Sequence, residues 1–250
     1  MLAEERRQAI AEMVRRGGRG SLTELSGRFS VSVDTIRRDL TELDSVGAIR
    51  KVRGGALRRS PAPVSYRARI ERDLHAKSRI AELAAQHIEP GMVVGIDNGT
   101  TSIQLIREIP EHLAFTAVTT NLPLAIELGE RQAVTVLVPG GEVMGPAQAV
   151  MGSTTCSFLG QVRLDVSIIS ACGIDIDAGL TAINLPEANV KRFLVRQATR
   201  TIVLATQEKL GTVEPFQFAT VQEIDLLLTD ASQASLEAFL DRQVPIQIVR

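Results

Sequence analysis

The sequence is poor in residues on which several classes of protein depend. Only 3% of its 250 residues are aromatic, with one tyrosine and no tryptophan. This scarcity argues against a single-stranded nucleic-acid platform built on stacked rings. The two cysteines, Cys156 and Cys172, form no Cys-x-x-Cys pattern, and the three histidines are scattered without ligand spacing. We therefore predict no disulfide framework, no structural metal and no cofactor.

Two further absences concern location. The first residues, MLAEERRQAI, lack the apolar centre of a signal peptide, and no uninterrupted apolar run approaches the length of a membrane span. We therefore expect a cytoplasmic protein with no membrane partner. Its 44% hydrophobic and 23% charged residues are typical of a soluble globular protein, and 250 residues suffice for two domains.

Charge is distributed unevenly along the chain, although the net charge is only -1. The residues up to Ser60 include 13 basic and 8 acidic side chains, whereas the remainder holds 15 basic and 21 acidic ones. A basic segment joined to an acidic body suggests a nucleic-acid-binding module attached to a second, different domain.

The stretch from Ser32 to Leu43 has the pattern of a helix that meets DNA. Ser32 is a suitable N-cap, and the apolar residues that follow recur at one helical face: Val33, Ile36, Leu40 and Leu43. Arginines and small hydroxyls on the other side can contact phosphates and base edges in a major groove. The candidate DNA-binding residues of this helix are Ser32, Asp34, Thr35, Arg37 and Arg38. An ordinary surface helix would show the same pattern, so the residues on either side of this helix have to distinguish the two interpretations.

The flanking residues complete a winged helix-turn-helix. A first helix is predicted over residues 4–16, and a second begins at Ser21, where Glu24 stands in the capping-box position. After the third helix, residues 48–53 and 56–59 predict a hairpin that turns at Gly54-Gly55. Its basic side chains Arg50, Lys51 and Arg53 would touch the sugar-phosphate backbone or an adjacent minor groove.

The rest of the chain predicts a connector and an α/β domain. Pro61 and Pro63 mark a boundary, which gives a DNA-binding domain over 1–59, a linker over 60–72 and a second domain over 73–250. Continuous apolar runs alternating with helical patterns predict a parallel sheet covered on both faces. The predicted strands are 92–96, 115–118, 134–138, 166–169, 201–205, 226–228 and 246–249. The predicted helices are 77–87, 101–109, 122–128 and 186–198.

Polar side chains follow three of these strands, at 97–101, 119–121 and 205–209. Functional sites in such sheets lie at the carboxyl ends of the strands. Helix-starting amides, threonine hydroxyls and a lysine can together hold a phosphate. Taken singly, each group could equally be a helix cap or a solvated lysine, but three together favour a shared anion pocket.

The chain resembles the DeoR family of bacterial transcription regulators, mostly repressors of sugar-utilisation genes. The resemblance rests on the TIRRDL motif at 35–40 and the Gly54-Gly55-Ala56 turn, and it extends through the second domain. It implies a sensor domain with a fold like that of ribose-5-phosphate isomerases and CoA transferases, and a phosphorylated sugar or related metabolite as effector. The implied effector-binding residues are Lys77, Asp97, Asn98, Gly99, Thr100, Thr101, Thr120, Asn121 and Lys209. Residues 98–101 would hold the phosphate.

One departure from the family pattern bears on the effector. The family usually has an aspartate three residues before Lys209, where this chain has Thr206. We therefore keep three hypotheses: a DNA-binding repressor controlled by a phosphorylated metabolite, a sugar-phosphate isomerase carrying a DNA-binding head, and a constitutive regulator whose second domain only oligomerises. In the first, a homo-oligomer would bind a double-stranded operator with paired half-sites, because one winged helix reads few base pairs.

Overall fold

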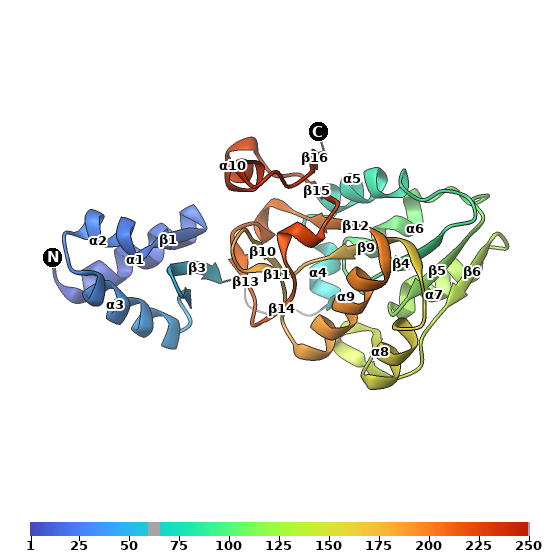
Figure 1. The fold of residues 1–250 in the computed structure, drawn as a ribbon, viewed down its shortest axis with the longest axis horizontal. Helices are drawn as coiled ribbons and strands as arrows, with labels where there is room; N and C mark the ends of the chain where they lie inside the picture. Colours follow the sequence, from blue (N-terminus) through green and yellow to red (C-terminus); the bar gives the residue numbers. More distant parts are fainter. Residues whose placement is uncertain (60–65, 250) are drawn as a thin grey trace.

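A computed structural model describes residues 1–59 and 66–249 of the chain. The two prolines that mark the predicted boundary lie outside the described residues. Figure 1 shows a small N-terminal domain joined to a larger α/β domain. The fold class predicted from the sequence is confirmed, with a helix-turn-helix followed by a parallel sheet.

The N-terminal domain contains three helices and a small sheet (Figure 1). The helices are α1 (Ala3–Gly17), α2 (Leu22–Phe29) and α3 (Val33–Ser45), and the strands are β1 (Arg19–Ser21), β2 (Arg50–Val52) and β3 (Gly55–Arg59). Ser21 caps α2 through the predicted capping box, and the Ser32 hydroxyl accepts the Thr35 amide at the start of α3. β3 pairs with both β1 and β2, so the wing is a three-stranded sheet rather than the predicted two-stranded hairpin.

An ion pair joins α1 to α3 beside the small core of this domain. The Arg6 Nε lies 2.6 Å from the Asp39 Oδ2, and both side chains are largely buried. The hydrogen bond with Asp39 raises the pKa of the Arg6 guanidinium. Asp39 therefore holds the third helix against the first, and the aspartate of the TIRRDL motif faces the protein interior.

The C-terminal domain is built on a seven-stranded parallel sheet in the order β16-β15-β12-β9-β4-β5-β6. These strands are β4 (Val93–Ile96), β5 (Phe115–Thr119), β6 (Val134–Leu137), β9 (Leu164–Ser170), β12 (Ala198–Ala205), β15 (Leu226–Thr229) and β16 (Ile246–Ile248). They are the seven strands that the apolar runs predict, and every pairing between them is parallel.

Helices cover both faces of this sheet, as the continuous apolar strands require. Along β9, Ile168 packs with α5 (Leu74–Ala85), α6 (Leu105–Glu108) and α7 (Leu122–Gly129), whereas Ile169 packs with α8 (Ser153–Leu159), α9 (Leu185–Gln197) and α10 (Gln233–Asp241). Neighbouring residues of one strand thus belong to two separate cores. The predicted helix over 101–109 is shorter, because Ser102–Gln104 forms a 3-10 turn, η1, before α6.

Other elements of this domain were not predicted from the sequence. They are the helices α8 and α10 given above, α4 (Tyr66–Glu71), β7 (Glu142–Met144), β8 (Ala149–Met151), β10 (Gly173–Asp175), β11 (Gly179–Ala182), β13 (Thr212–Val213), β14 (Phe216–Ala219), and the 3-10 turns η2 (Gly145–Ala147), η3 (Gln207–Lys209) and η4 (Val221–Glu223). Strand β13 pairs in parallel with β3 of the wing, so one sheet includes strands of both domains.

We expect Asp39→Asn to destabilise the N-terminal domain by about 1.5–3 kcal/mol, because a largely buried hydrogen bond to a charged group is lost. Hydrogen exchange of the full chain should show faster exchange in α1 and α3. Asp34→Asn is the matched control, since it removes an exposed ion pair with Arg37 that should contribute at most about 1 kcal/mol. Equal effects of the two substitutions would contradict a structural role for Asp39.

Candidate DNA-binding surface and effector site

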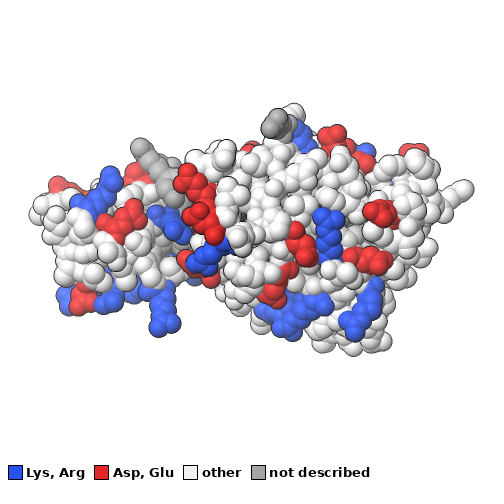
Figure 2. All heavy atoms as spheres, turned by 45° about the horizontal axis from the view of Figure 1, so that its top comes forward, with Lys and Arg blue, Asp and Glu red and all other residues white. Residues whose placement is uncertain are grey.

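The third helix presents one polar face to solvent. Ile36 and Leu40 are fully buried, whereas Asp34, Arg37 and Arg38 are exposed. Figure 2 shows Lys and Arg side chains, interspersed with acidic ones, along the lower edge of the N-terminal domain at the left. The exposed face can therefore place guanidinium groups against phosphates and base edges.

The wing meets this helix through side chains. The Lys51 Nζ donates a hydrogen bond to the Thr41 Oγ1 at 2.6 Å, which holds β2 beside α3. Lys51 and Arg53 are exposed and Arg50 is half-buried. Thr41 was not among the predicted DNA-binding residues, although it lies one helical turn beyond Arg37 and Arg38 on the same face. Helix and wing therefore present exposed basic side chains next to each other.

A cavity in the C-terminal domain lies where the order of the parallel strands reverses. From β4 the chain continues outward through β5 and β6, and it later returns to β9 on the other side of β4. Ligands bind at such reversal points in open α/β sheets. The cavity is lined by residues that follow β4, β9 and β12 and by residues of α4, α5 and α9: Arg69, Arg72, Lys77, Asn98, Gly99, Thr100, Thr101, Ser170, Ala171, Cys172, Ile183, Glu187, Leu204, Ala205, Thr206, Glu208 and Lys209.

Six of the nine predicted effector-binding residues line this cavity: Lys77, Asn98, Gly99, Thr100, Thr101 and Lys209. Asn98 is 3% exposed, and its side-chain oxygen has no hydrogen-bond partner among the described residues. The remaining three, Asp97, Thr120 and Asn121, are buried beside the cavity and are absent from its lining.

Asp97 is buried next to the cavity-lining residues and connects them through its hydrogen bonds and ion pair. Its carboxylate pairs with the Lys191 ammonium and accepts hydrogen bonds from Ser102 and from the amide and hydroxyl of Ser170. Burial raises the pKa of Asp97, but Lys191 and these donors outweigh burial and bring the pKa below its ordinary value. Lys191 is fully buried, and it was not predicted as a site residue. Its place beside Asp97 depends on contact between residues 94 positions apart.

The turn after β5 has a structural role. The Asn121 Oδ1 accepts the Leu124 amide at the start of α7, and its Nδ2 donates to the Tyr66 hydroxyl at 3.1 Å. Tyr66 is 3% exposed, so the first residue of α4 is anchored in the C-terminal domain. The helix within the predicted linker therefore packs on the domain that follows it.

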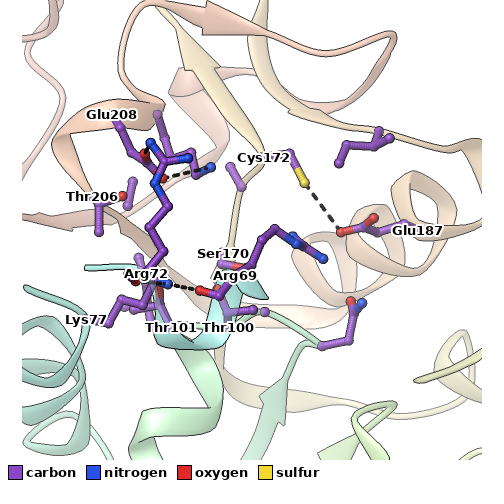
Figure 3. Close-up of a pocket in the computed structure, with 17 residues that line it drawn as sticks. Arg69, Arg72, Lys77, Thr100, Thr101, Ser170, Cys172, Glu187, Thr206 and Glu208 are labelled. Atoms are coloured by element: carbon purple, nitrogen blue, oxygen red, sulfur yellow. Dashed lines mark hydrogen bonds and ion pairs between the residues drawn. The ribbon is translucent and has the colours of Figure 1, made fainter. Parts of the chain in front are cut away.

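Anchored in this way, α4 brings Arg69 to the cavity, together with Arg72 in the turn directly after the helix. Arg72 reaches Glu208, and Arg69 points toward the side that holds Cys172 and Glu187 (Figure 3). The Lys77 ammonium donates to the backbone carbonyls of Arg69 and Arg72 and so secures the end of this helical turn. Sequence reasoning missed both arginines as site residues, although the spacing of Tyr66, Arg69 and Arg72 places them on one helical face.

Two carboxylates balance these cations. Glu208 pairs with Arg72 at 2.8 Å and with Lys209 at 3.1 Å. Glu187 accepts from the Cys172 thiol and lies 3.6 Å from the Lys191 ammonium. Thr206 stands where the family usually has an aspartate and has no carboxylate. Glu187 and Glu208 thus provide the carboxylates of this cavity.

The Cys172 thiol is not activated as a nucleophile. Burial, together with the neighbouring Glu187, raises its pKa to about 12. The thiol therefore remains protonated at neutral pH and cannot act as a thiolate nucleophile.

Comparison with known proteins fits this division into two domains. Residues 6–62 match the DeoR-like helix-turn-helix domain, and residues 72–231 match the DeoR C terminal sensor domain. The chain belongs to the DeoR family. It is 34% identical to the HTH-type transcriptional regulator GlpR of Haloferax volcanii over 93% of this chain and 91% of that protein.

Two further comparisons concern a full-length relative and a solved structure. The Glycerol-3-phosphate regulon repressor of Escherichia coli is 29% identical over 99% of this chain and 100% of its own length. Ribose 5-phosphate isomerase A of Methanocaldococcus jannaschii matches 53% of this chain and 52% of that chain, with 16% identity and a TM-score of 0.40. Family membership makes this protein a DNA-binding transcriptional regulator.

The described part of this DeoR-family chain has neither a helix long and apolar enough to cross a membrane nor a group of three or more His, Cys, Asp or Glu side chains able to hold a metal ion.

We expect Asp97→Asn to destabilise the sensor domain by about 3–5 kcal/mol, because it removes the nearer carboxylate of the buried Lys191 ammonium and leaves only Glu187, 3.6 Å away. Urea unfolding of the full chain measures this change. Asp177→Asn removes an exposed pair with Arg242 and should change stability by at most about 1 kcal/mol. A loss for Asp97→Asn as small as that control would show that the buried pair does not hold the domain together.

The lowered pKa of Lys77 predicts that the stability of the folded chain depends on pH. Burial lowers the pKa of its ammonium to about 8, from 10.5 in an exposed lysine. Between these values the unfolded chain binds more protons than the folded chain, so stability due to Lys77 increases as pH rises from about 8 to 10.5. Chemical unfolding at several pH values should show this rise, and Lys77→Met should remove it. A wild-type profile that matches the variant's would contradict the prediction.

Proposed function

We propose that this protein represses genes of carbohydrate metabolism and that a phosphorylated sugar or related metabolite controls its affinity for operator DNA. The observation that carries the proposal is the cationic cavity at the strand reversal, in a chain whose other domain presents a basic helix and wing. Thr100, Thr101 and Lys209 supply hydroxyls and an ammonium at the cavity. Arg69 and Arg72 add guanidinium groups suited to a phosphate.

The remaining lining fits the hydroxyl-bearing part of such a metabolite. The unpartnered oxygen of Asn98 can accept a hydrogen bond from a ligand hydroxyl, and Glu187 supplies a carboxylate nearby. We assign the phosphate to the side with Thr100, Thr101 and Lys209, and the hydroxyls to Asn98 and Glu187. The name of the glycerol-3-phosphate regulon repressor supports a small phosphorylated polyol or sugar as the effector class.

The roles of Asp97, Thr120 and Asn121 are indirect in this proposal. Asp97 positions the turn that carries Asn98 and Thr100, and Asn121 positions α4 through Tyr66. For the DNA we assign Ser32, Asp34, Thr35, Arg37 and Arg38 to the major groove, and Arg50, Lys51 and Arg53 to the backbone beside it. A homo-oligomer would present two such heads to paired half-sites, because one head reads few base pairs.

We infer a sensor rather than an isomerase. Three carboxylates, Asp97, Asp175 and Glu187, are the acid–base candidates that the sequence offers near the pocket, and of these only Glu187 lines the cavity. Asp97 is committed to Lys191, and Asp175 accepts the amides of Asp177 and Ala178 in a turn elsewhere. Acid–base catalysis needs a titratable group within reach of the substrate proton. Of the two cavity carboxylates, Glu208 is paired with Arg72 and Lys209 and Glu187 lies beside a protonated thiol, which supports binding better than proton transfer.

The test begins with DNA that the full chain selects from a random double-stranded library. Arg38→Ala should weaken binding to the selected site about 5- to 100-fold, as expected for loss of one base or phosphate contact. Arg196→Ala removes the same charge from an exposed position on α9 and should leave the affinity unchanged. If the full chain selects no preferred sequence from the library, the proposal that it is a sequence-specific regulator is wrong.

The effector is tested with phosphorylated sugars and polyols on the same protein. A compound present at 100 times its dissociation constant should stabilise the folded chain by about 2.7 kcal/mol, which a thermal shift detects. That compound should also change the affinity for the selected DNA. A folded protein that responds to none of the compounds would contradict metabolite control and favour a second domain that only oligomerises.

A further inference from the structure

The five residues Gln207–Gly211, here called the connecting segment, lie between the effector cavity and the DNA-binding wing. Glu208 and Lys209 line the cavity. The segment leads directly into β13, whose Thr212 and Val213 pair in parallel with Arg58 and Arg59 of β3. One short stretch of chain therefore touches the candidate ligand site at one end and the wing at the other.

The side chain of Glu208 forms ion pairs with Arg72 and Lys209, two of the cations on which the proposed phosphate site depends. Its carboxylate lies 2.8 Å from the Arg72 Nη2 and 3.1 Å from the Lys209 Nζ (Figure 3). All three side chains remain partly accessible, with 21% of the Glu208, 21% of the Lys209 and 43% of the Arg72 side chain exposed. These ion pairs are open to exchange with a dissolved anion, unlike the fully buried pair of Asp97 and Lys191.

The backbone of the connecting segment is held by the wing. The Arg58 guanidinium donates to the Glu208 carbonyl at 2.9 Å and reaches the Leu210 carbonyl at 3.5 Å. The Arg58 amide donates in turn to the Gly18 carbonyl, at the end of α1. A shift of Glu208 therefore acts on Arg58, which belongs to the strand that pairs with β1, β2 and β13.

We propose that Glu208 is a built-in competitor for the effector's anionic group, and that its displacement is transmitted to the wing through the connecting segment and Arg58. The proposal rests on the proposed function, because it names how that same site is regulated. Arg72 and Lys209 bind Glu208 when no anion is present and bind the phosphate when one enters. The displaced carboxylate must then move away, and the carbonyls that hold Arg58 move with it.

The chemistry favours this exchange. A phosphate monoester carries a charge of about -1.5 to -2 at neutral pH and three acceptor oxygens, against a single negative charge on Glu208. It therefore competes strongly with the Glu208 carboxylate for Arg72 and Lys209. Each arrangement satisfies the cations, so the ligand selects between two states of the segment. Reciprocity requires that DNA binding to the wing alter the affinity for the anion by the same factor.

The test compares binding of inorganic phosphate and of glycerol 3-phosphate to the full-length wild type, Glu208→Gln and Glu130→Gln, by calorimetry. Glu208→Gln keeps the size of the side chain but removes the competing charge, so we expect anion affinity to rise on the order of tenfold, within the range of known couplings. Glu130→Gln removes the same charge from an exposed position after α7 and should stay within about twofold of the wild type.

A second arm follows the wing by hydrogen exchange of residues 50–59, with and without glycerol 3-phosphate. In the wild type the compound should change exchange in this segment. In Arg58→Gln the compound should still bind, but the change at the wing should be lost. This arm separates transmission from binding, because Arg58 is absent from the cavity lining.

The outcomes are distinct. Tighter anion binding by Glu208→Gln, together with loss of the wing response in Arg58→Gln, supports the inference. A wild type that binds the probes while Glu208→Gln binds no more tightly overturns it and leaves the proposed function standing. A wing response that persists in Arg58→Gln overturns the transmission route. A wild type that binds neither these probes nor any other phosphorylated sugar or polyol overturns the proposed function itself.

Discussion

The ion pair between Asp97 and Lys191 is the constraint on which the sensor site depends. Two opposite charges are completely buried at the point where the strand order reverses. Removing Lys191 would leave the Asp97 charge buried without a cation, and removing Asp97 would leave the Lys191 ammonium with only Glu187, 3.6 Å away, in a medium that stabilises isolated charges poorly. The pair therefore fixes the relative positions of the turn after β4, the end of β9 and helix α9, which together supply much of the cavity wall.

The same pair restricts what the neighbouring residues can be. Asp97 also binds the Gly99 amide and the Ser170 hydroxyl, which draws these two residues together. A Cβ atom at position 99 would collide with the Ser170 side chain, so only glycine fits there. The turn that exposes Asn98, Thr100 and Thr101 is thus shaped from beneath by groups that a ligand does not reach. This explains why a polar, buried Asp97 belongs to the site without lining it.

Much of the fold could be predicted from the sequence because it depends on local patterns. The seven apolar runs are the seven parallel strands, and the capping pair Ser21 and Glu24 begins the second helix as predicted. The turn glycine and threonines could be placed near the cavity for the same reason, since parallel strands end at one edge of the sheet.

The remaining features required contacts that sequence spacing does not reveal. Lys191 is 94 positions from Asp97, and nothing in a helix containing one lysine says that the lysine is buried. The helix α4 was assigned to a linker because of the prolines that precede it, whereas burial of Tyr66 against Asn121 holds it on the sensor domain. Strand β13 is only two residues long, too short for any periodic signal, and it forms by pairing with the wing.

Two of these unpredicted elements, α4 and β13, share the property that they lie where the two domains connect. Helix α4 lies within the predicted linker and supplies Arg69 to the cavity, with Arg72 directly after the helix, while the segment before β13 supplies Glu208 and Lys209. Both routes from the DNA-binding domain thus end in cavity-lining residues whose charges a phosphate would satisfy. A wall built only from strand-end turns could bind a metabolite without consequence for the head. Because part of this wall is instead made from the connections themselves, the proposed binding of a ligand by Arg72 and Lys209 would couple occupancy of the cavity to the position of the wing.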